Sequence, residues 1–215
     1  MEKFRHFPYF HRLLCPFTFP YFPMRSIIRQ LFLFLCISSS TYAQSDLFPH
    51  TQQRWVDSVF ASLSTDEKIG QLLMPRGNSN PTYDTTRLFS IIRDYHVGGF
   101  VLFAGYPTVQ ARLVNEMQRR SKVPLFIGMD LEWGLNMRLD STVRFPYQMT
   151  LGAMQGNDAL IEKMGFQIAQ QCKRMGIHIN YAPVVDVNNN PNNPVINFRS
   201  FGENRDLVTE TALAY

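Results

Sequence analysis

The chain has 215 residues, with 21 Lys or Arg against 17 Asp or Glu, and a formal net charge of +4 at pH 7. Five of the basic residues but only one acidic residue lie in residues 1–43, so the remainder carries 16 of each and is neutral. Its charge therefore gives no reason to expect nucleic-acid binding, which relies on a basic surface. Cys172 is the only cysteine after residue 43, which excludes an internal disulfide or a cysteine metal cage there.

The segment that begins at Met24 has the organisation of a secretory signal peptide. Two arginines precede an apolar run, Ile27–Ile37, and small polar residues then lead to a cleavage site that ends at Ala43. The apolar run is shorter than the roughly 20 residues that a membrane-spanning helix needs. We expect cleavage after Ala43, no stable membrane span afterwards, and export to the periplasm or the exterior of a bacterium. A retained membrane anchor is the alternative.

Residues 1–23 do not resemble the start of a signal peptide, because they cluster Phe, Pro and Tyr. Met24 is therefore the expected true start. Residues 1–43 are interpreted as an N-terminal extension plus signal peptide, and residues 44–215 as the folded part.

Helical and strand patterns alternate along the folded part. The predicted elements are, in chain order, a helix at Arg54–Ser62, a strand at Ile69–Met74, a helix at Thr85–Tyr95, a strand at Phe100–Phe103, a helix from Pro107, a strand at Val123–Met129, a helix at Ala159–Met175, a strand at Ile177–Val187 and a helix from Asp206. Such alternation predicts an α/β fold with a parallel sheet. Two architectures fit: a small doubly wound sheet, or the first half of a TIM-type (β/α)8 barrel, which typically needs about 250 residues.

Charged side chains follow the third and fourth predicted strands. Asp130 and Glu132 come directly after the third strand, and Asp186 ends the fourth; Arg138 and Arg199 lie on the loops that follow. Functional residues of a (β/α)8 barrel gather at the carboxyl ends of its strands. A carboxylate accepts hydrogen bonds from two hydroxyl groups and a guanidinium donates a fork of them, so this set suits a sugar.

Each of these residues also has a purely structural interpretation. Asp130 and Arg138 would equally form an ion pair that ties a loop to the barrel rim. Trp133 is more often a packed aromatic than a sugar platform, and Asp186 would equally cap a turn. We expect His178, inside the fourth strand pattern, to be a core or rim histidine rather than a ligand.

Two motifs resemble those of the family 3 glycoside hydrolases, the β-N-acetylglucosaminidase kind. Ile179–Glu203 reads INYAPVVDVNNNPNNPVINFRSFGE, and it is similar to the family pattern INFAPVxDVxxNPxNPVIxxRSFGE. Asp130–Arg138 reads DLEWGLNMR, and it resembles D-x-E-G-G-x-x-x-R. Ile69–Leu72 and Val97–Phe103 also resemble the first two strands of the family. The resemblance covers nearly all of residues 44–215.

The resemblance implies a (β/α)8 barrel that removes terminal β-linked sugars with retention and needs no metal or other cofactor. By this analogy Asp130 holds hydroxyls of the nonreducing sugar, Arg138 lies beside it, and Arg199 contacts the same ring. Glu132 and Asp186 would be supporting residues that orient these groups. The Arg-Ser-Phe-Gly form favours release of N-acetylglucosamine from oligosaccharides or peptidoglycan fragments. A β-glucosidase of the same family, or a noncatalytic carbohydrate-binding fragment, is the alternative.

The chain departs from the family pattern in two respects. Trp133 stands where the family has its first glycine after the glutamate, which adds bulk near the expected sugar. The nucleophilic aspartate, the His-Asp acid/base pair and the Lys-His-x-Pro-Gly-His-Gly motif of the family do not occur before Tyr215. The resemblance therefore assigns a catalytic role to no residue here, and we expect residues 44–215 to be a partial barrel domain that is inactive by itself.

Overall fold

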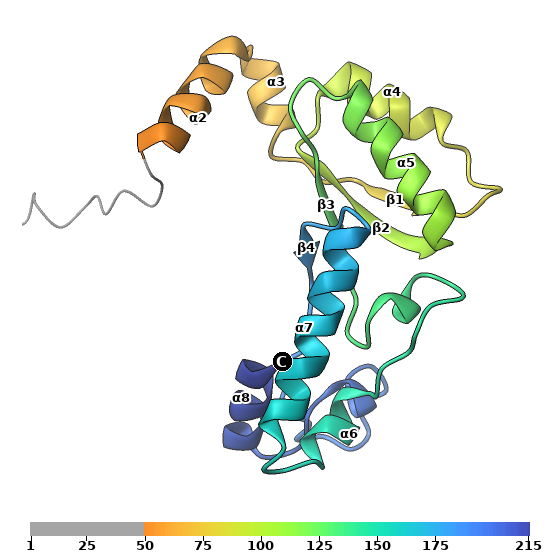
Figure 1. The fold of residues 1–215 in the computed structure, drawn as a ribbon, viewed down its shortest axis with the longest axis vertical. Helices are drawn as coiled ribbons and strands as arrows, with labels where there is room; N and C mark the ends of the chain where they lie inside the picture. Colours follow the sequence, from red (N-terminus) through yellow and green to blue (C-terminus); the bar gives the residue numbers. More distant parts are fainter. Residues whose placement is uncertain (1–49) are drawn as a thin grey trace, which may run out of the picture. The chain divides into compact units, whose positions relative to one another are not determined.

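The computed structural model describes residues 50–215, so the predicted leader lies outside the described residues. The chain divides into two units, Met1–Arg54 and Trp55–Tyr215, and the sheet and the site belong to the second. Its elements (Figure 1) are α2 (His50–Ser62, which begins in the first unit), α3 (Thr65–Gly70), β1 (Arg76–Ser79), α4 (Thr86–Tyr95), β2 (Gly99–Gly105), α5 (Pro107–Arg120), β3 (Phe126–Met129), η1 (Leu135–Met137), α6 (Gln148–Gly152), α7 (Asp158–Arg174), β4 (Ile179–Asn180), η2 (Asn197–Arg199) and α8 (Arg205–Ala214). No helix in this described part is long and apolar enough to cross a membrane.

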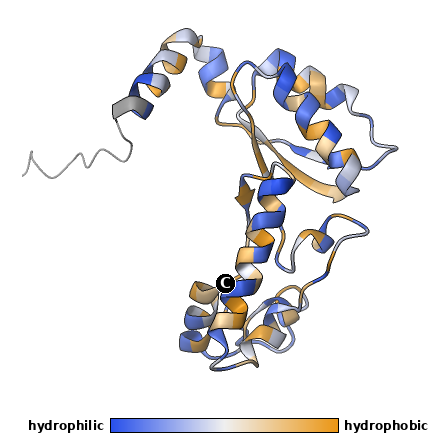
Figure 2. Cartoon of the chain, viewed as in Figure 1, coloured by the Kyte–Doolittle hydropathy of each residue, from blue (hydrophilic) through white to orange (hydrophobic). Residues whose placement is uncertain are grey.

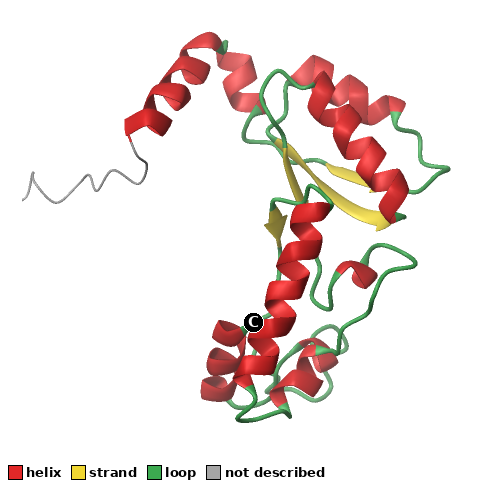
Figure 3. Ribbon diagram, in the orientation of Figure 1, coloured by secondary structure: helices red, strands yellow, loops and turns green. Residues whose placement is uncertain are grey.

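The four strands form one parallel sheet in the order β1-β2-β3-β4. Gly99 pairs with Phe126, and Gly128 pairs with Ile179, so each strand lies beside the next one in the chain. A doubly wound sheet reverses its strand order at a switch point, whereas a (β/α)8 barrel keeps it sequential. Helices α4 and α5 lie side by side over one face of β1–β3 (Figure 3), as barrel helices do. The sheet is therefore the first half of a TIM-type barrel, as predicted.

The core lies between these strands and the helices that cover them. Phe100 and Leu102 of β2 are fully buried, as is Ile127 of β3, and they belong to the same cluster as Leu88 of α4 and Met117 of α5. β2 is hydrophobic along most of its length, whereas α5 shows both polar and apolar residues (Figure 2). The helical spacing in α4 and α5 thus buries one stripe of each helix against the sheet.

The first strand was predicted at the wrong place. Residues 69 and 70 end α3 and a turn follows, while the strand itself is Arg76–Ser79. Ser64 starts α3 with a capping box, accepting a hydrogen bond from the Glu67 N–H while the Glu67 side chain accepts one from the Ser64 N–H. Leu72 is 83 % exposed, so the apolar run Ile69–Met74 is not a buried strand despite its composition. The true strand, RGNS, has no apolar residue that would reveal it.

Two glycines allow close packing around the end of α3, Gly70 against the end of α4 and Gly98, just before β2, against Gln71. A Cβ on Gly98 would lie 2.0 Å from the Gln71 carbonyl oxygen, and a Cβ on Gly70 would lie 1.9 Å from the Tyr95 carbonyl oxygen. The Gly98 N–H donates to the carbonyl oxygens of Gly70 and Leu73, both at 3.1 Å. A side chain at either position would push these segments apart. Glycine is therefore required in both the Ile-Gly-Gln and the Val-Gly-Gly sequences.

The other predicted elements are confirmed, with differences at their ends. All five predicted helices are present: α2, α4, α5, α7 and α8. The third strand begins at Phe126 rather than Val123, and the fourth comprises only Ile179 and Asn180 rather than residues 177–187. The apolar run predicted a longer fourth strand than the structure has, because only these two residues pair with β3 in the sheet.

Candidate functional site

Asp130 and Arg138 form an ion pair at the carboxyl end of β3. Asp130 directly follows the strand, and Arg138 directly follows η1. Arg138 Nη2 donates to Asp130 Oδ2, and the two side chains are 24 % and 28 % exposed respectively. The Arg138 guanidinium also lies over the ring of Phe103 in β2, 4.8 Å from its centroid. The ion pair and the ring together hold the plane of the guanidinium while both charged groups keep solvent contact.

Glu132 and Arg199 form a second and more buried pair. Arg199 Nη2 donates to Glu132 Oε1 at 2.6 Å, and Arg199 Nε donates to Oε1 at 3.1 Å and Oε2 at 3.0 Å. The Glu132 side chain is 1 % exposed and that of Arg199 is 29 % exposed. This forked geometry is the strong form of an arginine–carboxylate contact. The pair ties the loop after β3 to the Arg-Ser-Phe-Gly loop.

Negative charges around Arg199 connect the two pairs electrostatically. The hydrogen bond to Glu132 raises the pKa of Arg199, and the charges of Asp130 and Asp186 raise it further. Asp186 is exposed, and its backbone oxygen accepts a hydrogen bond from Ser200 Oγ at 2.6 Å. The structure therefore brings the five predicted site residues together, with Glu132 supporting Arg199 directly and Asp186 acting on it through charge.

The backbone of Glu132 is held by two further side chains. Gln148 Nε2 donates to the Glu132 carbonyl oxygen at 2.5 Å, and the Tyr215 hydroxyl donates to the carbonyl oxygens of Leu131 and Glu132, each at 3.2 Å. Burial raises the pKa of Tyr215, so its hydroxyl stays protonated and remains a donor at neutral pH. These contacts fix the loop that carries the charged residues. Their partners lie far along the chain, and no spacing signal in the sequence indicates them.

Three aromatic rings gather next to the Glu132–Arg199 pair. Trp133 contacts Tyr147 edge-to-face with ring centroids 4.8 Å apart, and Tyr147 contacts Phe198 at 4.5 Å. Trp133 and Phe198 are 6.3 Å apart. Of these three residues the sequence singles out only Trp133, since Tyr147 and Phe198 occupy no defined motif position.

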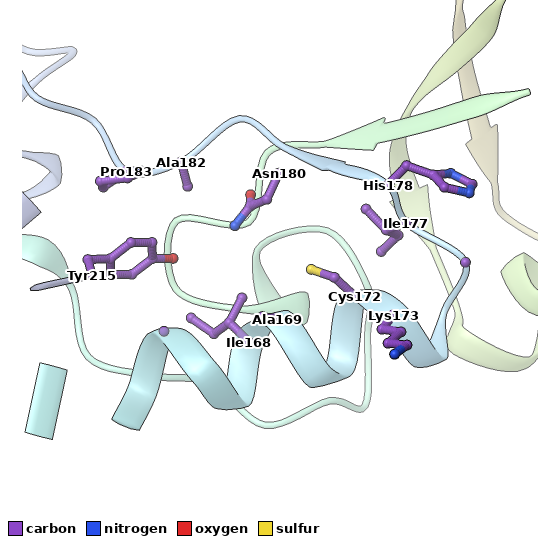
Figure 4. A pocket seen from close by; sticks show the side chains of 12 residues that line it. Ile168, Ala169, Cys172, Lys173, Ile177, His178, Asn180, Ala182, Pro183 and Tyr215 are labelled. Atoms are coloured by element: carbon purple, nitrogen blue, oxygen red, sulfur yellow. The ribbon is translucent and has the colours of Figure 1, made fainter. Parts of the chain in front are cut away.

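A cavity beside α7 is lined by His178 and, at its other end, by the Tyr215 side chain that holds the Glu132 backbone. His178 Nδ1 accepts a hydrogen bond from the Ile127 N–H at 3.1 Å, which uses that ring nitrogen structurally. The cavity, of about 500 Å³, is lined by α7, the segment 176–183 and Tyr215 (Figure 4). Its labelled side chains are mainly apolar, with the Asn180 amide and the Tyr215 hydroxyl pointing toward it. None of the five predicted site residues lines this cavity.

A match to a protein-family model shows which family the chain belongs to. Residues 64–215 match the model of the glycosyl hydrolase family 3 N-terminal domain. The chain belongs to this family. The family match begins at Ser64, the first residue of the capping box, and includes the whole sheet and both ion pairs.

Its relatives in the family include named hexosaminidases. The chain is 34 % identical over 178 residues to beta-hexosaminidase A of Pseudoalteromonas piscicida, covering 71 % of this chain and 30 % of that protein. It is 30 % identical over 162 residues to a beta-N-acetylglucosaminidase/beta-glucosidase of Cellulomonas fimi, covering 75 % of this chain and 28 % of that protein. The chain thus spans about 30 % of the length of these curated relatives.

A solved structure of the family agrees with the fold. The family 3 β-N-acetylglucosaminidase from Paenibacillus sp. str. FPU-7 superimposes with a TM-score of 0.63 at 34 % identity, over 71 % of this chain and 30 % of that chain. This likeness agrees with the partial barrel indicated by the sequential strand order.

Proposed function

We propose that the protein acts as a glycosidase that releases terminal β-linked N-acetylglucosamine from oligosaccharides or peptidoglycan fragments, with retention of configuration. The observation that carries this proposal is the pair of arginine–carboxylate contacts at the carboxyl end of β3, made by Asp130 with Arg138 and by Glu132 with Arg199. The names of the relatives in the family support it.

Within this function, the described residues bind the sugar. Asp130 and Arg138 are partly exposed, so Asp130 accepts hydrogen bonds from two neighbouring hydroxyls and Arg138 donates to one of them. Arg199 uses Nε and Nη2 on Glu132, which leaves Nη1 to turn toward the ligand, since its contact with the Val195 oxygen is long at 3.4 Å. Charge-assisted hydrogen bonds of this kind compete well with water for a polar ligand.

The test is the hydrolysis of two matched substrates by the protein as its gene encodes it. We expect cleavage of an aryl β-N-acetylglucosaminide, and a β-configured first product by NMR, since retaining enzymes conserve the anomeric configuration. Cleavage of only the aryl β-glucoside would instead favour the β-glucosidase alternative, which the double name of the Cellulomonas fimi relative also suggests. If neither substrate reacts while N-acetylglucosamine still binds, the noncatalytic alternative holds.

Export is a separate part of the proposal. It rests on the signal-peptide pattern from Met24 to Ala43. Expression of the gene in a bacterial host should give a periplasmic or extracellular protein whose first residue, by mass spectrometry, is Gln44. An intact N-terminus in the membrane fraction would show a retained anchor, and a cytoplasmic product would contradict export.

A further inference from the structure

The segment η2, which carries Arg199, has little packing of its own. None of its three residues is buried. Its backbone bonds run from the Arg199 N–H to the Ile196 oxygen at 2.8 Å and from the Ser200 N–H to the Asn197 oxygen at 3.2 Å. A single 3-10 turn has poorer hydrogen-bond geometry than an α-helix, so bonds of this kind do not hold a segment in place by themselves. The position of η2 is therefore set by the contacts of its side chains.

The chain on the two sides of η2 differs in burial. Ser200 and Phe201, which follow it, are 0 % and 1 % exposed, and Ser200 Oγ donates to the Asp186 carbonyl oxygen. The residues that precede it are mostly exposed, with Val195 at 62 %. The segment is thus anchored at its carboxyl end, while its amino end continues into an exposed loop.

Phe198 supplies a contact for the less anchored part of η2. Its ring centroid lies 4.5 Å from that of Tyr147, with the two planes inclined by 49°, and 6.3 Å from that of Trp133. Trp133 in turn meets Tyr147 nearly edge-on, at 83°. Tilted and edge-on arrangements are the favourable ones for aromatic pairs at these distances. The ring of Phe198 therefore attaches η2 to the other two rings.

These two rings belong to the same part of the site as Glu132. Trp133 is the next residue in the chain, and Tyr147 directly precedes Gln148. Gln148 is fully buried and donates to the Glu132 carbonyl oxygen. The carboxylate that binds Arg199 and the rings that contact its neighbour are thus held by one framework.

Two separate attachments of η2 have a consequence for ligand binding. The Arg199 guanidinium uses Nε and Nη2 on Glu132, and the proposed function requires it to donate to the sugar as well. If the ion pair alone held η2, a shift of the guanidinium toward a ligand would also release the backbone. The contact through Phe198 holds the backbone independently, so the guanidinium reaches the ligand from a fixed Cα and less conformational freedom is lost on binding.

We propose that Phe198, packed on Trp133 and Tyr147, is a positioning residue that fixes η2 and thereby places Arg199 for the sugar. This inference rests on the proposed function. The role requires no contact between the three rings and the ligand. Trp133 stands where the family pattern has glycine, and Phe198 falls at a variable position of that pattern. The aromatic attachment is therefore a feature of this chain and not of the motif.

The experiment is a double-mutant cycle between Phe198 and Arg199, measured by calorimetry of N-acetylglucosamine binding to the gene-encoded protein. Phe198→Ala should weaken binding about fivefold in the unaltered background and less than about twofold in the Arg199→Ala background, because a positioning residue acts through its neighbour. Phe198→Tyr keeps the ring and should bind as the unaltered protein does. Phe166→Ala on α7, where Phe166 is 59 % exposed, is the matched control and should leave binding unchanged.

Hydrogen exchange tests the same role without a ligand. The Arg199 and Ser200 amides, which form the backbone bonds of η2, should exchange at least about tenfold faster in Phe198→Ala, whereas the amides in the middle of α7 should not change. Trp133→Gly should accelerate the same two amides by a smaller factor, because its ring lies farther from Phe198 than that of Tyr147 does.

Equal losses of affinity in the two backgrounds would overturn the inference, because Phe198 would then act on the ligand by a route other than Arg199. Unchanged affinity in Phe198→Ala, or unchanged exchange of the two amides, would overturn it as well. The proposed function fails separately if the unaltered protein neither binds N-acetylglucosamine nor hydrolyses its β-glycosides. The exchange experiment then still decides whether Phe198 fixes η2.

Discussion

Arg199 donates three hydrogen bonds to the carboxylate of Glu132, a residue 67 positions earlier in the chain whose side chain is 1 % exposed. The contact fixes two loops of the site with respect to each other. It also orients the guanidinium before any ligand arrives, so less conformational freedom is lost on binding.

Replacing Glu132 by Gln tests how much this contact contributes to the stability of the fold. The amide keeps the shape but leaves the partly buried Arg199 charge without its counter-charge, so we expect a loss of about 2–3 kcal/mol in the free energy of unfolding, somewhat below the usual cost of breaking a fully buried pair. Urea denaturation measures it. Glu116→Gln is the control, because Glu116 pairs with Arg119 and Arg120 on an exposed helix face, where we expect less than about 1 kcal/mol. Equal losses in the two variants would contradict the prediction.

Replacing Asp130 by Asn tests sugar binding. The change exchanges one acceptor oxygen for a donor and removes the charge that strengthens hydrogen bonds to hydroxyls, so N-acetylglucosamine should bind at least about tenfold more weakly, a loss within the 1.5–3 kcal/mol of a charged hydrogen bond. Calorimetry measures the change. Asp140→Asn is the control, since Asp140 is an exposed residue of the same loop. If the two variants bind alike, Asp130 is a structural partner of Arg138 and nothing more.

Phe103 offers a subtler test, because the guanidinium groups of Arg76 and Arg138 both lie over its ring, at 4.5 and 4.8 Å from the centroid. Phe103→Leu keeps an apolar side chain but removes the ring. We expect sugar affinity to fall about two- to fivefold, which corresponds to the 0.5–1 kcal/mol of a partly exposed cation–π contact.

Phe89→Leu serves as the control for Phe103→Leu. Phe89 lies under the guanidinium of Arg120, at 4.4 Å, but on α4 rather than in the site. Its variant should lose a similar cation–π contact and bind the sugar normally. A similar fall in both affinities would show that the effect on binding is a general loss of stability.

The contact between Glu67 and Lys122 predicts a pH dependence. The hydrogen bond from Lys122, at 2.7 Å, and that from the Ser64 N–H lower the pKa of Glu67 from 4.5 to about 2. A lowered carboxyl pKa stabilises the folded state above the unfolded pKa, and this stabilisation is lost as the pH falls from about 4.5 to about 2.

The Lys122→Met variant should therefore be less stable than the unaltered protein at pH 6, and the difference should shrink as the pH falls toward 2. Thermal unfolding at a series of pH values measures it. Glu67→Gln has no carboxyl group to titrate, so its own stability should vary less with pH over this window. A constant difference between Lys122→Met and the unaltered protein at all pH values would contradict the assignment.

The helices were predictable because each rests on a local pattern, whereas the strand order was left open between two architectures until the family resemblance favoured the barrel. Leu88 and Ile92 repeat at helical spacing and are buried in α4, as the periodicity requires. The first strand was not predictable in this way. Gly77 and Ser79 are its buried residues, and neither is apolar, whereas the apolar Leu72 and Leu73 nearby are exposed.

The charged residues of the site were found through motifs, but their pairing was not. Arg199 was expected at the sugar with Glu132 as a support, and the structure shows the direct three-bond contact between them. Phe198 and Tyr147 were missed because aromatic side chains in loops carry no periodicity. Only the fold brings them beside Trp133.

The partners of the Glu132 backbone also bear on the order of events during synthesis. Its carbonyl oxygen is held from Gln148, 16 residues later, and from Tyr215, 83 residues later. At typical rates of translation, the second partner emerges on the order of ten seconds after the loop itself. The loop after β3 thus cannot make all of its native hydrogen bonds until residue 215 has been synthesised, well after the strand that precedes the loop.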